Sequence, residues 1–298
     1  MSQENIVEEP RSGWGGPWTE QKLNAFTKYV GAYLTIMKKY DFWETIYFDG
    51  FAGSGNRHPD CVTPLYKELG LTVNDDRLYK GAAERVLSLA PEKPFNYYYF
   101  IDKKEESIDK LKTKLSGFQE NIKVPFQFKA GDCNQYVLEL SKAMKERPDK
   151  YAALVLLDPF GMQIDWNSIA SLKETRSDVW ILIPTGVIVN RLLDKKAELR
   201  SIKKLESFFG LGEKDIKAYF YKKERQQTLF GETEIIRKVE EPIEKIASLY
   251  IERLNTIWKY VTTEPKVLYN KRNVPIFHFV FASNNQNAAK IAGQIIKS

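Results

Sequence analysis

The stretch Ile46-Tyr47-Phe48-Asp49-Gly50-Phe51-Ala52-Gly53-Ser54-Gly55 decides the fold of this chain. An apolar, β-favouring run ends in Asp49, and a glycine-rich turn follows at once. This order predicts a buried parallel strand over residues 44–49 that feeds a tight loop, because glycine lets the backbone pass close to a bound ligand. Nucleoside cofactors bind at such turns, beyond the carboxyl end of the first strand.

The rest of the chain repeats the alternation of helix and strand. A helix is predicted over 20–40, and further strands over 95–101, 126–130, 152–157 and 179–183, with helical patterns between them. Strict alternation implies a parallel sheet with right-handed crossovers. The alternation of helix and strand stops at residues 187–241, and we expect this segment to form a helical insertion rather than part of the sheet. A helix over 243–259, two strands over 267–269 and 276–282 that suit a hairpin, and a helix over 286–297 complete the chain.

Four carboxylates stand at the ends of four consecutive predicted strands: Asp49, Asp102, Asp132 and Asp158. The carboxyl ends of parallel strands meet at one edge of the sheet, where ligands bind. Asp102 is placed to accept hydrogen bonds from two ribose hydroxyls, Asp132 to accept one from an adenine amino group, and Asp49 to take an ammonium group. The structural alternative for each is a helix N-cap.

The turn itself has the pattern Asp-x-Phe-x-Gly-x-Gly over residues 49–55. It is neither the dinucleotide fingerprint nor a phosphate-binding loop. It resembles motif I of S-adenosylmethionine-dependent methyltransferases. That resemblance implies a Rossmann-like class I methyltransferase fold, an α/β fold with a mostly parallel seven-strand sheet and a C-terminal antiparallel hairpin. It also implies S-adenosylmethionine as cofactor, held by Asp49, Phe51, Gly53, Gly55, Asp102 and Asp132.

The segment Asp158-Pro159-Phe160-Gly161 resembles the Asp/Asn-Pro-Pro-Tyr/Phe motif of amino-directed nucleic-acid methyltransferases. The resemblance implies catalytic roles for Asp158, Pro159 and Phe160, in which the carboxylate accepts a hydrogen bond from the target amine and the ring stacks on the base. This chain has one proline rather than two, so Phe160 comes one place early. The alternative is a structural turn after a buried strand.

The predicted insertion is basic. From Arg191 to Arg225 there are eleven Lys/Arg and six Asp/Glu, an excess of +5 in a chain whose net charge is +6. Cations neutralise phosphates and aromatic rings stack on bases, which favours a nucleic-acid surface. The alternative is a solvated helical face with Phe208 and Phe209 in the core. The candidate nucleic-acid-binding residues are Asn190, Arg191, Lys195, Lys196, Arg200, Lys203, Lys204, Lys222 and Lys223.

The composition of the chain argues against several classes of protein. Two cysteines and two histidines in 298 residues predict neither a disulfide framework nor a metal site. There is no signal-peptide pattern and no apolar run near the roughly 18 residues of a membrane span, so we expect a cytoplasmic protein. We expect a flexible arm over 1–17 and one domain over 18–298, with an irregular excursion over 56–77.

Five segments together resemble a bacterial family, the three-Cys-motif partner proteins. They are 18–23 (Trp-Thr-Glu-Gln-Lys-Leu), 47–55, 100–102, 157–161 and 183–193 (Ile-Pro-Thr-Gly-Val-Ile-Val-Asn-Arg-Leu-Leu), of which the last is the most specific. The resemblance implies a methyltransferase-like fold and a partner protein with a radical S-adenosylmethionine iron–sulfur site built from the partner's own cysteines.

Three functions follow as hypotheses. The first is methyl transfer to an amine or similar nucleophile on nucleic acid. The second is an accessory subunit whose methyltransferase fold supports the chemistry of the three-Cys-motif partner. The third is Mg²⁺-dependent phosphate chemistry at the aspartates, because hard cations take carboxylates.

Overall fold

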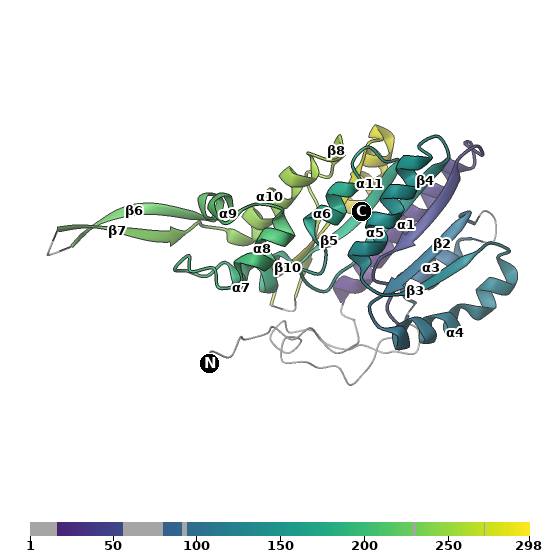
Figure 1. The fold of residues 1–298 in the computed structure, drawn as a ribbon, viewed down its shortest axis with the longest axis horizontal. Coiled ribbons are helices and arrows are strands. Elements are labelled where there is room, and N and C mark those ends of the chain that lie inside the picture. The colour runs from purple at the N-terminus through teal and green to yellow at the C-terminus, as the bar shows by residue number, and fades with distance from the viewer. Residues whose placement is uncertain (1–16, 56–79, 91–93, 229–230, 271) are drawn as a thin grey trace.

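The computed structural model describes residues 17–55, 80–90, 94–228, 231–270 and 272–298. Its centre is an eight-stranded sheet in the order β3-β2-β1-β4-β5-β10-β8, with β9 also paired to β10 (Figure 1). The predicted arm over 1–17, except Pro17, and the predicted excursion over 56–77 lie outside the described residues. The strands of this sheet are β1 (Glu44–Asp49), β2 (Tyr97–Asp102), β3 (Phe126–Ala130), β4 (Tyr151–Leu157), β5 (Ser177–Ile183), β8 (Tyr260–Val261), β9 (Lys266–Tyr269) and β10 (Pro275–Ser283).

Strands β1 to β5 are all parallel, whereas β10 runs antiparallel to β5. This is the Rossmann-like class I methyltransferase fold, so the predicted fold class is confirmed. The strand count differs by one. Both β8 and β9 pair with the edge of β10 that faces away from β5, and a short irregular segment at 262–265 interrupts what would otherwise be one strand. Two residues were too few to give β8 a recognisable pattern in the sequence.

Helices cover both faces of the sheet (Figure 1). Alternate strand residues feed two cores: Leu154 and Leu156 of β4 point to one face, and Val155 and Leu157 to the other. The first core packs against α1 (Pro17–Met37), α3 (Ala82–Ser88), α4 (Glu105–Asn121) and α11 (Gln286–Lys297), and the second against α5 (Cys133–Glu146), α6 (Trp166–Ser171) and α10 (Pro242–Leu254). Strands buried on both faces explain the nearly continuous apolar runs in the sequence.

The insertion after β5 is only partly helical, which corrects our prediction for residues 187–241. It contains a π-helical turn, η2 (Thr185–Val189), the helices α7 (Asn190–Leu192), α8 (Ile202–Phe209) and α9 (Glu213–Phe220), and a two-stranded ribbon of β6 (Tyr221–Thr228) and β7 (Gly231–Lys238). The ribbon projects away from the sheet, at the left of Figure 1.

The ribbon escaped prediction because neither of its faces is apolar. Exposed cross-strand ion pairs join its two strands instead, Lys223 with Glu234 and Arg237 with Glu224, both at 2.9 Å. Charged side chains along both strands give no hydrophobic period of two, which is the usual signal for a strand. The base is fixed to the domain by the Tyr221 hydroxyl, which donates to the backbone oxygen of Asp194 at 2.7 Å.

The turn after β5 packs directly against the start of β10. A Cβ atom on Gly186 would lie 2.2 Å from the carbonyl oxygen of Pro275 and 2.8 Å from the Cα of Ile276. Both neighbours are backbone atoms, which cannot rotate away. Glycine is therefore required here for close approach of two chain segments rather than for its torsion angles.

We predict that Gly186→Ala lowers the free energy of unfolding by about 2 kcal/mol or more, because the added methyl group forces the two backbone segments apart. Urea denaturation measures the change. The matched control is Gly117→Ala in α4, where nothing lies within 4 Å of the new Cβ. The control should stabilise the helix slightly. Equal effects of the two substitutions would contradict the packing described for Gly186.

Candidate cofactor site

The carboxyl ends of β1, β2 and β4, with the loop after β3, enclose a cavity of about 320 Å³. All four predicted aspartates line it, so the structure brings together residues that are up to 109 positions apart in the chain. Of the other predicted site residues, Phe51, Gly53, Gly55 and Phe160 also line the cavity, whereas Pro159 does not.

The glycine turn forms one wall of the cavity. Gly53 and Gly55 have φ angles of 61° and 71°, in the left-handed region that favours glycine. The Ala52 amide donates to the Ile101 carbonyl at 2.8 Å, which attaches the turn to the end of β2. The turn is thus a fixed backbone surface of the kind that a nucleoside cofactor can approach closely.

Asp49 lies at the bottom of the cavity and is only 1 % exposed. Its carboxylate accepts hydrogen bonds from the Tyr47 hydroxyl at 3.1 Å and from the Phe51 amide at 3.3 Å. Burial, together with the nearby charge of Asp158, raises the pKa of Asp49 to about 7. The group therefore changes charge near neutral pH, which makes its interaction with a cation dependent on pH.

Asp132 caps the helix that follows it, Asp102 stabilises the turn before α4, and both line the cavity. The Oδ1 atom of Asp102 accepts from the Lys104 amide at 2.9 Å, and Asp132 is the N-cap of α5, with its Oδ1 accepting from the Asn134 amide at 2.9 Å. The helix-capping alternative is therefore real for Asp132. Each of these bonds uses Oδ1, so neither bond engages the second carboxylate oxygen of its residue.

The turn at residues 158–161 is shaped by Gln163. Its side-chain oxygen accepts from the amides of Phe160 at 2.9 Å and Gly161 at 3.3 Å. Phe160 is 6 % exposed and belongs to the core that packs against α1. Its ring therefore serves mainly to support the turn, and only part of it faces the cavity.

Lys22 lines the cavity and was not predicted as a site residue from the sequence. It lies on α1 and is 2 % exposed. Its ammonium group donates to both carboxylate oxygens of Asp158, at 2.6 Å for Oδ1 and closer still for Oδ2. A signal was present in the sequence: Lys22 stands four residues from both Trp18 and Phe26, on the apolar face of the predicted helix. A lysine on such a face needs a buried partner.

Asn134 is a second missed residue, and it joins two loops of the site. Its side-chain amide donates to Asp132 at 3.1 Å and to the Gln163 carbonyl at 2.9 Å. Its oxygen accepts from the Asp165 amide at 2.9 Å. The loop after β3 and the loop after β4 are thereby fixed relative to each other. No pattern in the sequence marks this role.

The candidate nucleic-acid residues lie outside the cavity. Arg191, Lys195, Lys196, Arg200, Lys203, Lys204, Lys222 and Lys223 are all exposed. Three of them form surface ion pairs, Arg200 with Glu198, Lys203 with Glu206 and Lys223 with Glu234. Asn190 is oriented inward instead, since its side-chain oxygen and its backbone oxygen both accept from Lys238, at 2.6 and 2.8 Å.

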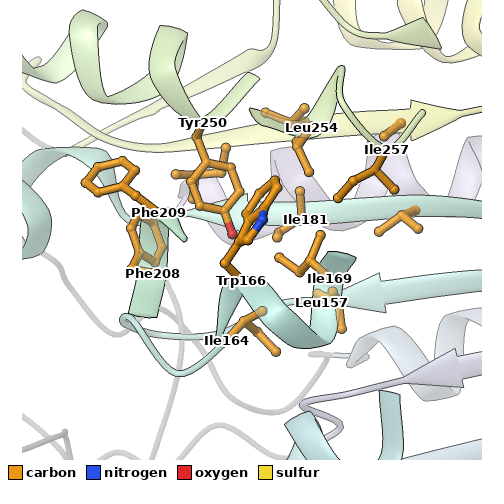
Figure 2. Close-up of a cluster of buried hydrophobic side chains, with 14 of the residues drawn as sticks. Leu157, Ile164, Trp166, Ile169, Ile181, Phe208, Phe209, Tyr250, Leu254 and Ile257 are labelled. Carbon is orange, nitrogen blue, oxygen red and sulfur yellow. The ribbon is translucent and has the colours of Figure 1, made fainter. Parts of the chain in front are cut away.

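Most aromatic residues of the insertion belong to the core, which contradicts their expected role as a stacking platform, and Tyr219 is only partly buried. Phe208 and Phe209 pack against Tyr250, and Figure 2 shows them in one cluster with Trp166 and Leu254. Phe220 is fully buried and contacts Phe209. The alternative stated for Phe208 and Phe209, a place in the core, is the one that the structure has.

Two other kinds of feature were sought among the described residues, a metal site and a membrane-spanning helix. No group of three His, Cys, Asp or Glu side chains in the described ranges is placed to hold a metal ion. His58 and Cys61 lie outside those ranges. In the part of the chain that the structure describes, no helix has both the length and the apolar character needed to cross a membrane.

Comparison with known proteins assigns the chain to no family. No family model matches the chain, and no curated protein sequence matches it. A DUF519 protein from Legionella pneumophila is similar over 91 % of this chain and 98 % of that chain, with 15 % identity and a TM-score of 0.41.

Two further solved structures have similarly low TM-scores. A complex of Trm1 from Pyrococcus horikoshii with S-adenosyl-L-methionine is similar over 97 % of this chain and 63 % of that chain, at 11 % identity and a TM-score of 0.43. Spermidine synthase from Thermotoga maritima is similar over 92 % and 62 %, at 8 % identity and 0.41. The chain thus spans somewhat less than two thirds of these two proteins. The assignment of the fold rests on the strand order of this chain itself.

We predict that the ion pair between Lys22 and Asp158 is needed for stability. Lys22→Met leaves a carboxylate without its buried partner, which should cost about 3–5 kcal/mol. The double variant Lys22→Met with Asp158→Leu removes both charges and should recover most of that loss. Urea unfolding of the single and double variants measures the coupling. Simple additivity of the two single losses would contradict a direct interaction.

Proposed function

We propose that this chain binds S-adenosylmethionine in the cavity and transfers its methyl group to an amino group or similar nucleophile on nucleic acid. One observation carries the proposal: four strand-end carboxylates and a left-handed glycine turn line a single cavity. The sheet edge is where this fold class places its ligands. The cavity volume is at the small end of the usual range for ligand sites, about 300–1,000 Å³.

The residues present fit this cofactor. Asp102 offers a carboxylate at the end of β2, where two ribose hydroxyls can donate to it. Asp132 offers an acceptor for an adenine amino group, and the exposed backbone of Gly53 and Gly55 lets the cofactor approach. Asp49 offers a negative charge to the ammonium group of the methionyl part. When bound, S-adenosylmethionine supplies an electrophilic methyl group on a positively charged sulfur.

Asp158 is the residue that would orient the nucleophile. A carboxylate has about four lone-pair positions, and Lys22 occupies one on each oxygen, so further positions can accept from a target N–H. Such a bond turns the lone pair of the amine toward the methyl group. Because the methyl group is already electrophilic, positioning and exclusion of water supply the main part of such catalysis.

Nucleic acid as the substrate is supported by the exposed cations of the insertion. Arg191, Lys195 and Lys196 follow the turn after β5, whose strand ends at the same sheet edge as the cavity. Cations there can neutralise phosphates that flank a target base. A base inside a duplex would have to be flipped out to reach the cavity.

A second candidate function is that of an accessory subunit for a three-Cys-motif partner with a radical S-adenosylmethionine site. One specific observation favours it: a buried lysine already holds both oxygens of Asp158, the residue expected to orient a target amine. The Mg²⁺-dependent alternative has no comparable support, since no set of three metal ligands occurs among the described residues.

We predict that Asp158→Ala, although destabilised by loss of the ion pair with Lys22, abolishes methyl transfer while its folded fraction still binds the cofactor, because the side chain orients the nucleophile rather than the cofactor. The measurement is incorporation of label from methyl-labelled S-adenosylmethionine into total RNA and DNA, alongside calorimetric titration. Asp165→Ala, on the loop after β4 but outside the cavity lining, is the control. Unchanged label incorporation in Asp158→Ala would rule out the role proposed for this residue.

We also predict that the affinity for S-adenosylmethionine depends on the charge of Asp49. The pKa of this carboxyl group is raised to about 7, so below that pH it is protonated and attracts the ammonium group less. Affinity should fall by up to about tenfold per pH unit below 7 and level off above it. Asp49→Asn should bind weakly at every pH. Calorimetry between about pH 5.5 and 8 tests this, and a flat profile for the wild type would contradict it.

A further inference from the structure

A second cleft opens at the amino ends of the parallel strands, whereas the cofactor cavity lies at their carboxyl ends. The volume of this cleft is about 1330 Å³, and its floor includes Ala152, Ser177 and Asp178, which lie at or next to the amino ends of β4 and β5. The walls come from the loop between α1 and β1, the segment after α10, and the amino end of α11. None of the residues assigned above to the cofactor or the nucleophile lines it.

Aromatic side chains are exposed along one rim of this cleft. Tyr40 and Phe42 are 46 % and 63 % exposed, and Phe42 is the most exposed of the large apolar side chains in the described part of the chain. The rings of Tyr40 and Phe42 are 6.0 Å apart, and those of Phe42 and Trp43 are 5.2 Å apart. These rings form a continuous aromatic surface that the protein's own core does not cover.

Arg176 extends this surface and adds a positive charge. Its guanidinium group lies 3.9 Å from the centre of the Trp43 ring, in a cation–π contact. A planar guanidinium stacked on an aromatic ring can still donate hydrogen bonds to phosphate from its edges. The rim therefore combines flat apolar faces with a donor for anions.

The charges around the cleft are mostly positive. Lys39, Lys173, Arg176 and Lys259 line it, all four are exposed, and none forms an ion pair with another described residue. The two acidic lining residues are Asp178 and Glu174. Asp178 is already engaged, since its two oxygens accept from the Tyr29 and Ser283 hydroxyls at 2.7 and 2.5 Å. An anion thus meets four cations and two carboxylates, of which Asp178 is hydrogen-bonded within the protein and interacts electrostatically with Arg176.

We propose that this cleft binds single-stranded nucleic acid. Exposed rings that stack on bases, set beside cations that contact the backbone, are the features by which proteins bind single strands without sequence preference. A duplex keeps its bases stacked on each other, so it cannot use Tyr40 and Phe42 in this way. The insertion offers cations without exposed stacking rings, whereas this cleft offers both. The proposal concerns a separate surface and does not depend on cofactor binding.

The test is fluorescence anisotropy of a labelled oligothymidine of about 16 nucleotides, a length within the usual range for such grooves. Phe42→Ala should weaken binding by about tenfold, the loss expected for one stacked base. Tyr269→Ala is the matched control, because this tyrosine is 45 % exposed but lies on β9, outside the cleft. It should bind as the wild type does.

Charge is tested in the same assay. Lys39→Gln combined with Lys173→Gln should reduce the slope of log affinity against log salt by about 0.7 for each phosphate that the variant no longer neutralises. The pair Lys110→Gln and Lys112→Gln, exposed on α4 and outside both the cavity and the cleft, is the control and should leave the slope unchanged. A duplex of equal length should compete poorly with the single strand.

Any of three results would overturn the proposal: no binding of the oligothymidine by the wild type, an equal loss in Phe42→Ala and Tyr269→Ala, or tighter binding of the duplex. A negative result in the strand-binding assay would not contradict the proposed cofactor site, because calorimetric binding of S-adenosylmethionine is measured without nucleic acid. Conversely, strand binding that depends on Phe42 in a chain that binds no cofactor would support this cleft alone.

Discussion

The site depends on three charged groups buried together: Lys22, Asp49 and Asp158. Lys22 and Asp49 are almost fully buried, and Asp158 is only partly exposed. The ion pair between Lys22 and Asp158 joins α1 to the end of β4, so the first helix is attached to the sheet at the point where the ligand cavity begins. With Asp49 ionised, these three groups carry one net negative charge in a region of low polarity. Burial of that charge is costly unless a cation offsets it, and the cofactor proposed here carries one.

Much of this arrangement could be predicted from sequence, because it follows from strand order. Once the strands ending in Asp49, Asp102 and Asp158 are recognised as parallel, their carboxyl ends must meet at one edge. The fold class and the convergence of the aspartates were therefore accessible from local patterns. Local patterns also gave the final helix over 286–297, whose bounds match α11.

Contacts between distant residues could not be predicted in the same way. Lys22 and Asp158 are 136 residues apart, and a single sequence shows only that Lys22 stands on an apolar helix face. The β6–β7 ribbon lacks an apolar face, so the strand signal was absent. For Phe208 and Phe209 the composition of the segment suggested a surface, but both rings pack against Tyr250, which lies elsewhere in the chain.

The carboxyl ends and the amino ends of the parallel strands offer different features, and a nucleic-acid methyltransferase would need both. The carboxyl ends offer carboxylates and a glycine turn suited to a nucleoside with a positive charge. The amino ends offer exposed rings and cations suited to a polyanion with accessible bases. The net charge of +6 does not conflict with an acidic cavity, because most of the excess positive charge lies in residues 191–225, outside the cavity.

The most direct test of the account is calorimetric titration of the purified chain with S-adenosylmethionine, repeated on Asp102→Ala. The account predicts saturable binding by the wild type at one site per chain. It also predicts a large loss of affinity in the variant, with unchanged unfolding behaviour. If the wild type does not bind S-adenosylmethionine, or if Asp102→Ala binds it equally well, the cavity at the carboxyl edge is not the cofactor site that we propose.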